Sequence, residues 1–310
     1  MIALWNRWVR RAARPVDVRP YAIVRILLPI CVIVDQLSLA YLGMADDAYR
    51  LFADGGLSSW RSPDFVLTGL GPDGGMILLG VVLVSMAMVA LGVGSRPASV
   101  IAVLAYAQLG ALHPGGDRAI DRIIRTTLLL LVFTRAHRCY TLPTALGWRE
   151  RVRTTPGWVR DAFHLWLTLM YLSAGVTKIS AGKWLSMSAI PELWRVLTNP
   201  VAAYQSTQSP VLRALWPVLR LAGAVATLNE LLSPLLLTRW AKWWALVCAT
   251  MHLGVAFGMK LGMFSWGMLS LYPILFAPWL VPVLDRIEAR LGWEPPPDAP
   301  SLDGAEASPS

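Results

Sequence analysis

Residues 21–42 of the chain read YAIVRILLPICVIVDQLSLAYL, an apolar run broken by two charged side chains, Arg25 and Asp35. A transmembrane helix needs about 17–25 predominantly apolar residues, so this run is long enough to cross a bilayer. A charged side chain inside such a run is costly and is a functional candidate by default. The stretch therefore predicts a membrane-spanning helix and places Asp35 among the candidate residues.

Similar apolar blocks recur along the chain. Hydrophobic residues make up 55% of the 310 residues and charged residues 15%, whereas soluble domains carry about 25% charged residues; the mean hydropathy is +0.51. We therefore predict an all-α integral membrane protein with about eight transmembrane helices. The expected spans lie near Tyr21–Leu42, Met76–Val93, Ala98–Leu112, Ala119–Ala136, Val159–Ile179, Val211–Leu237, Trp240–Met259 and Phe264–Leu284.

The net charge of +9 comes from arginines and lysines in the loops rather than from one basic surface. This distribution orients membrane proteins with the basic loops inside, and it argues against a nucleic-acid partner. With eight spans, every basic loop falls on one side, and the acidic loop between the first two spans falls on the other. We expect a multi-pass protein of the plasma or inner membrane with cytoplasmic N- and C-termini.

Three regions follow from this organisation. We expect a basic cytoplasmic arm over 1–19, a transmembrane domain over 20–284, and a disordered cytoplasmic tail over 285–310. The segment Ser180–Gln208 is too polar to span and too apolar for a free loop, so it predicts an extracytoplasmic interfacial helix. The three cysteines have neither metal-ligand nor disulfide spacing, and we predict no metal site. The basic start has no small-residue cleavage site, so the first span is expected to remain as an anchor.

Four ionisable residues of three spans share one predicted depth near the extracytoplasmic surface. They are Asp35, Asp121, Arg125 and Lys178. The shared depth suggests a polar pocket, although Asp35 and Arg125 could equally form a simple ion pair. For Glu230 and His252, the plain alternative to a functional role is a structural polar contact between the sixth and seventh spans.

On the fifth span, His164, Tyr171 and Lys178 are spaced seven residues apart. Each step turns a helix by about −20°, so the three side chains share one face. A buried lysine readily loses its charge, and a neutral amine is a base for a weakly acidic hydroxyl. The alternative is a lysine at a helix end whose ammonium group reaches the membrane surface.

Three further segments carry a resemblance. They are YLSAGVTKISAGKW over 171–184, NELLSPLLL over 229–237, and GMFSWGMLSLYPILFAPW over 262–279. In this order they resemble the HTTM family, the membrane domain shared by vitamin K-dependent gamma-carboxylase and microbial homologues. The opening run with Arg25 and Asp35 also fits the first span of that family.

The resemblance implies a chemistry. In the carboxylase, a lysine of an Ala-Gly-x-Lys-Lys motif is taken as the base that deprotonates vitamin K hydroquinone, and that lysine falls on Lys178 here. The implied cofactor is a reduced quinone of the vitamin K hydroquinone or menaquinol type, with O2 and CO2 as co-reactants. This sequence departs from the motif at Thr177, where the first lysine would stand, and no histidine stands at Arg118–Ala119, where the carboxylase has one.

These observations support two main hypotheses. The first is a carboxylase-like membrane enzyme (lyase or oxidoreductase chemistry) acting on an extracytoplasmic substrate that a separate peptide or soluble protein supplies. The second is a non-catalytic module that binds membrane lipid or quinone, or assembles with a partner. A transporter is disfavoured because no internal repeat is visible. We assign Lys178 as catalytic; Asp121, Arg125, Tyr171, Trp184 and His252 as cofactor-binding; and Asp35 and Glu230 as structural polar residues.

Overall fold

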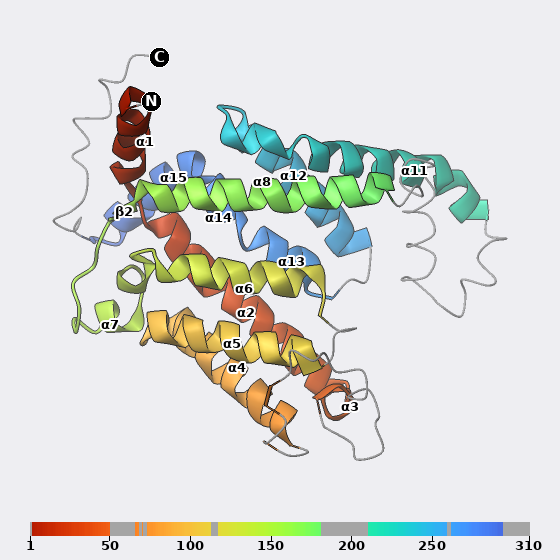
Figure 1. Cartoon of the computed structure of the whole chain (residues 1–310), viewed down its shortest axis with the longest axis horizontal. Coiled ribbons are helices and arrows are strands. Elements are labelled where there is room, and N and C mark those ends of the chain that lie inside the picture. Colours follow the sequence, from red (N-terminus) through yellow and green to blue (C-terminus); the bar gives the residue numbers. More distant parts are fainter. Residues whose placement is uncertain are drawn as a thin grey trace. The chain divides into compact units, whose positions relative to one another are not determined.

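The computed structural model describes residues 2–49, 66–67, 70, 73–112, 117–180, 210–258 and 262–293. The chain divides into two compact units, and each is described below by itself. Unit 1 comprises Met1–Arg160 and Phe276–Ser310, and unit 2 comprises Asp161–Leu275. Both units are built almost entirely of helices (Figure 1), as the sequence predicts.

In unit 1, four helices pack in sequence order, with α4 against both α2 and α5 and with α6 against α5. Shorter elements connect and flank them. The elements are α1 (Ile2–Ala13), β1 (Pro15–Asp17), α2 (Arg19–Tyr41), α3 (Ala45–Tyr49), α4 (Gly74–Leu91), α5 (Ser95–Leu112), α6 (Ala119–Val132), η4 (Ala136–Arg138), α7 (Leu142–Ala145), β2 (Thr154–Pro156) and α15 (Ala277–Arg290).

Unit 2 contains most of α8 (Gly157–Ser180), followed by α11 (Pro210–Leu231), η5 (Ser233–Leu237), α12 (Ala241–Gly258), α13 (Phe264–Leu269) and α14 (Tyr272–Leu275). The first five expected spans and the seventh therefore each coincide with one helix, whereas the sixth, Val211–Leu237, is divided between α11 and η5. The eighth is wrong as a single helix, because Phe264–Leu284 is divided among α13, α14 and α15. The expected interfacial helix over Ser180–Gln208 falls, apart from Ser180, outside the described residues.

Two of the described helices, α2 and α4, are by themselves long and apolar enough to cross a membrane. A third candidate arises if Phe264–Leu275 and Ala277–Arg290 are counted as one span. The outward faces of these helices are apolar: Val84 of α4 is 62% exposed, and Leu37 of α2 is 52% exposed. Apolar faces of this kind suit contact with lipid rather than water. The chain therefore has the character of a membrane protein.

Hydrogen bonds to backbone carbonyl groups accommodate the charge of Arg25 inside α2. Its side chain is 1% exposed and donates hydrogen bonds to the carbonyl oxygens of Val89 (2.5 Å), Ala90 (2.7 Å), Cys139 (3.3 Å) and Tyr140 (2.7 Å). The first two carbonyls lie in the last turn of α4, where carbonyl groups lack the regular helical N–H partner four residues on. The guanidinium thus joins α2 to the end of α4 and to the segment between η4 and α7.

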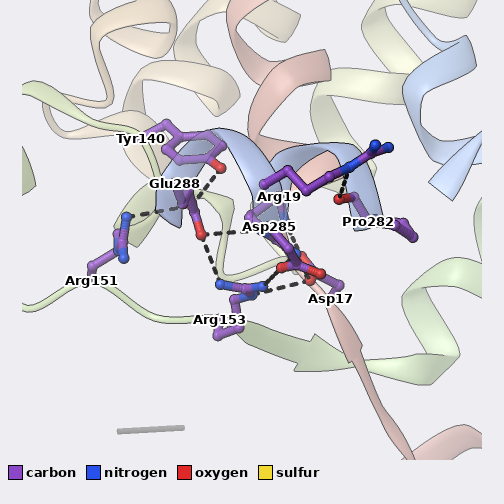
Figure 2. Close-up of polar contacts among 9 residues, drawn as sticks. Asp17, Arg19, Tyr140, Arg151, Arg153, Pro282, Asp285 and Glu288 are labelled. Atoms are coloured by element: carbon purple, nitrogen blue, oxygen red, sulfur yellow. Dashed lines mark hydrogen bonds and ion pairs between the residues drawn. The ribbon is translucent and has the colours of Figure 1, made fainter. Parts of the chain in front are cut away.

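A network of ion pairs joins three distant segments of unit 1 (Figure 2). Glu288 of α15 accepts hydrogen bonds from Arg19 (3.1 Å), Arg153 (2.8 Å) and the hydroxyl of Tyr140 (2.6 Å). Asp285 also pairs with Arg19 (2.8 Å) and with Arg153. Burial and the hydrogen bond to the Glu288 carboxylate raise the pKa of Tyr140 above its usual value.

The same region contains a two-stranded antiparallel sheet that the all-α prediction missed, because three-residue strands leave no periodic pattern. In it, Val16 of β1 lies opposite Thr155 of β2. The predicted start of the disordered tail at 285 is also wrong, because α15 continues through Arg290 and Glu288 is 5% exposed. Ion pairs of Asp285 and Glu288 with Arg19 and Arg153 hold this part of α15 in place.

Candidate functional site

Lys178 lies in the last turn of α8 and forms an ion pair with Glu230 near the end of α11. Its Nζ atom donates to Glu230 Oε1 at 2.5 Å. The side chains are 22% and 8% exposed, respectively. The predicted contact between Glu230 and His252 is therefore replaced by a contact with Lys178, because the Glu230 carboxylate is positioned toward α8. The alternative for Lys178 was an ammonium group that reaches the membrane surface without a partner. The partly buried ion pair with Glu230 differs from that alternative.

A second polar group lies deeper in unit 2. The Tyr171 hydroxyl is 2.8 Å from His252 Nε2 and 3.0 Å from the Tyr272 hydroxyl. All three residues are buried, with side chains from α8, α12 and α14. His252 is also within electrostatic range of Lys178, so the two polar groups belong to one cluster. We call Tyr171, Lys178, Glu230, His252 and Tyr272 the unit 2 cluster.

Tyr272 is the member of this cluster that the sequence analysis missed. Tyr272 belongs to the segment 262–279, which carries part of the family resemblance. A buried tyrosine hydroxyl usually finds a hydrogen-bond partner, so a tyrosine inside an apolar block is the signal that could have identified it. The sequence does place Tyr171 correctly on the face of α8 that carries Lys178.

Several buried polar atoms of unit 2 have no hydrogen-bond partner within the part of the chain that the structure describes. They include Trp166 Nε1, Glu230 Oε2, His252 Nδ1 and Ser265 Oγ. A buried polar atom without a partner costs about 1–3 kcal/mol, and native proteins contain few of them. Glu230 Oε2 and His252 Nδ1 belong to the unit 2 cluster. These atoms are suited to contact a polar molecule that enters from outside the chain.

The turn that carries Glu230 is held by its neighbours. Trp244 Nε1 donates to the Asn229 carbonyl oxygen (2.9 Å), and Asn229 Nδ2 donates to Cys248 Sγ (2.7 Å). On the other side, Gly175 of α8 packs closely on α11, since an added Cβ would lie 3.1 Å from Leu231. Small residues allow helices in membranes to approach closely. The Ala-Gly pair of the α8 motif thus brings Lys178 within reach of α11.

The other predicted site residues lie in unit 1. Asp121 is 4% exposed and accepts hydrogen bonds from the Tyr106 hydroxyl (2.5 Å) and the Arg118 backbone N–H (2.8 Å). Asp35 pairs with Arg118 at 2.5 Å. Burial would lower the pKa of Arg118, but hydrogen bonds with Asp121 and Asp35 outweigh it and raise the pKa. Arg118 therefore links the two aspartates.

Arg125 binds Asp117 through two hydrogen bonds of 2.7 and 3.0 Å. Burial would raise the pKa of Asp117, but the hydrogen bonds and charges of Arg125 and Arg122 outweigh it, and the pKa is lowered. The alternative pairing of Asp35 with Arg125 is therefore wrong, because each has a nearer partner at the start of α6. Sequence reasoning missed both partners, Asp117 and Arg118, since they read as loop charges.

The predicted pocket residues thus form two sets. Lys178, Tyr171, His252 and Glu230 come together in unit 2, whereas Asp35, Asp121 and Arg125 belong to unit 1. A shared extracytoplasmic layer that joins the two sets stays a prediction. Trp184 lies outside the described residues.

Comparison with known proteins adds one finding to this geometry. A family model described as the HTTM domain matches residues 13–279, which is most of the chain. No curated protein matches the sequence, and no solved structure matches it.

Proposed function

Because this chain belongs to the HTTM-domain family, which is related to vitamin K-dependent carboxylase, we propose that it is a membrane-embedded, carboxylase-like enzyme. It uses a quinol-type lipid cofactor, with Lys178 as the base. The observation that carries this proposal is the ion pair between Lys178 and Glu230, set in a cluster with unsatisfied polar atoms.

The membrane topology is part of the proposal. Eight spans with cytoplasmic termini place the arginine-rich segment between α6 and α8 inside, in accordance with the charge rule for membrane loops. The end of α8 with Lys178 then faces the extracytoplasmic side. A substrate would be supplied there, by a separate peptide or soluble protein, with O2 and CO2 as co-reactants.

The residues of the unit 2 cluster fit a reduced quinone. Such a cofactor supplies two weakly acidic hydroxyl groups and reducing electrons when it is bound. Glu230 Oε2 offers an acceptor, and His252 Nδ1 and Ser265 Oγ are polar atoms that can accept or donate. Each of the three is a buried atom without a partner among the described residues. We assign Glu230 and His252 as the residues that would hold the cofactor hydroxyl groups.

Lys178 needs a free amine to act as a base, and the geometry offers a route to one. The Lys178 proton points at Glu230 Oε1 along a 2.5 Å bond. Apolar surroundings disfavour buried charges and favour their neutral forms. Transfer of the proton to the carboxylate leaves a neutral amine that can accept a proton from a bound hydroxyl. Glu230, assigned from sequence as structural, thereby acts as the proton partner of the base.

The ion pair also supports a second candidate function. A lysine that stays protonated beside a carboxylate joins α8 to α11 and performs no proton transfer. In that case, the protein would be a non-catalytic module that binds lipid or quinone or assembles with a partner protein. Threonine at position 177, where the carboxylase motif has a lysine, favours this alternative.

Bound lipid tests the cofactor assignment. We expect a quinone or quinol to co-purify with the wild-type protein in mild detergent and to be lost from Lys178→Ala, because the amine contacts its hydroxyl group. Lipid extraction followed by mass spectrometry measures this. Thr177→Ala is the matched control, since the Thr177 hydroxyl donates to the Ser173 carbonyl oxygen of its own helix (2.8 Å). Equal amounts of quinone in all three proteins, or none in any, would contradict the assignment.

A further inference from the structure

A cavity of about 840 Å³ lies in unit 1, far in sequence from the unit 2 cluster. Its wall is formed by the end of α4, the segment around α7 and the residues that follow α15. Small-molecule sites measure about 300–1,000 Å³ and are mostly apolar with a few polar groups. Ala90, Leu91 and Leu142 contribute apolar surface here, and Arg151 is the charged residue among the described lining residues.

Arg151 lines the cavity and also takes part in the neighbouring ion-pair network through Glu288. Its hydrogen bond to Glu288 is 3.4 Å long, whereas Glu288 receives shorter bonds of 2.8 Å from Arg153 and 2.6 Å from Tyr140. Charge-assisted bonds of full strength measure about 2.7–2.9 Å. A guanidinium has five N–H donors, so an anion that enters the cavity can accept from Arg151 beside Glu288.

Aromatic residues hold Arg151 at the cavity. Its guanidinium lies over the ring of Trp293 at 5.2 Å, and the rings of Tyr140 and Trp293 are 6.1 Å apart. Figure 2 shows Tyr140 and Arg151 on either side of Glu288. Tyr140 adopts a positive φ of 51°, a conformation that costs energy in a residue other than glycine. The contacts around Tyr140 maintain this backbone conformation and place the Tyr140 ring in the wall of the cavity.

The rim of the cavity is apolar and exposed. Leu91, Leu142 and Trp293 all present large parts of their side chains to the outside, and the nearby Trp148 and Arg149 are exposed as well. Exposed tryptophans beside basic residues are typical of the boundary between lipid tails and headgroups, and arginines there attract anionic lipids. The rim thus favours an amphiphile over a fully water-soluble anion.

We propose that this cavity binds an anionic phospholipid, with the phosphate beside Arg151 and the upper acyl chains against Leu91 and Leu142. The site lies on the side of the arginine-rich segment, which the charge rule assigns to the cytoplasmic leaflet. The site shares no residue with the unit 2 cluster, so its test does not depend on the proposed enzymatic function.

Native mass spectrometry of the delipidated full-length protein tests this site. Phosphatidylglycerol or phosphatidylcholine with identical acyl chains is added in detergent, and the retained lipid is measured. Wild type should retain one phosphatidylglycerol in preference to phosphatidylcholine. Arg151→Gln should weaken that retention about fivefold, as expected for one arginine near an anionic lipid. Ala145→Trp should abolish it by filling the cavity, since Ala145 lines it and is exposed.

Arg122→Gln is the matched control, because it removes an arginine whose side chain is 71% exposed and which does not line the cavity. It should retain lipid as wild type does. Unfolding temperatures of all variants show whether each is folded. Equal retention of both lipids, or unchanged retention in Ala145→Trp, would overturn the proposal. Displacement of the lipid by excess inorganic phosphate would also overturn it, since the site would then recognise the free anion.

Discussion

Replacement of Lys178 by alanine should lower quinol-dependent turnover by about 100-fold or more, the usual contribution of a positioned base. In the proposed mechanism, the amine of Lys178 accepts the proton of a bound hydroxyl after its own proton has moved to Glu230. Alanine offers no group that can accept a proton. Oxygen uptake by the protein reconstituted in lipid nanodiscs, with a reduced quinone as substrate, measures the effect.

Loss of folding could mimic this result, because Lys178→Ala leaves Glu230 buried without its cation. A double variant, Lys178→Ala with Glu230→Gln, removes the unpaired charge as well. It should recover much of the unfolding temperature and still show no turnover. Thr177→Ala should keep wild-type turnover. Activity of Lys178→Ala within about twofold of wild type would exclude Lys178 as the base, since a twofold change is far below the contribution of a general base.

The second large effect is expected at Glu288. Its carboxylate is shared by Arg19, Arg153, Arg151 and Tyr140 within unit 1. Glu288→Ala should lower the free energy of unfolding by about 3–5 kcal/mol, because removal of one partner of a buried ion pair leaves the other charge uncompensated. Unfolding of the protein in mixed detergent micelles, followed by fluorescence, measures this free energy.

Glu150→Ala is the control for that experiment. Glu150 pairs with Arg138 at 3.8 Å, but its side chain is 87% exposed. Exposed pairs of this kind contribute about 0–1 kcal/mol, so this variant should unfold close to wild type. If Glu288→Ala and Glu150→Ala unfold alike, the network around Glu288 does not stabilise unit 1.

The helices and their limits could largely be predicted from the sequence. Long apolar blocks place α2, α4, α5, α6, α8, α11 and α12 within a few residues. The same criterion failed at the eighth span, because apolar composition does not show where a helix breaks. It also set the start of the tail too early, because Ala277–Arg290 is one helix whose Asp285 and Glu288 pair with Arg19 and Arg153.

The site could be predicted only in part. A seven-residue spacing places Tyr171 and Lys178 on one face of α8, because that spacing repeats the helical period. It carries no information on which other helix approaches that face. The pairing of Lys178 with Glu230, the contact of Tyr171 with Tyr272, and the role of Arg118 between Asp35 and Asp121 all depend on tertiary packing.

The central claim is that this HTTM-domain protein turns over a reduced quinone at the unit 2 cluster. Its most direct test is oxygen uptake by the wild-type protein in nanodiscs supplied with menaquinol, with Lys178→Ala measured in parallel. The proposal predicts uptake that requires both the quinol and Lys178. Quinol that binds without any oxygen uptake above that of empty nanodiscs would contradict the enzyme and leave the lipid-binding module as the function of this chain.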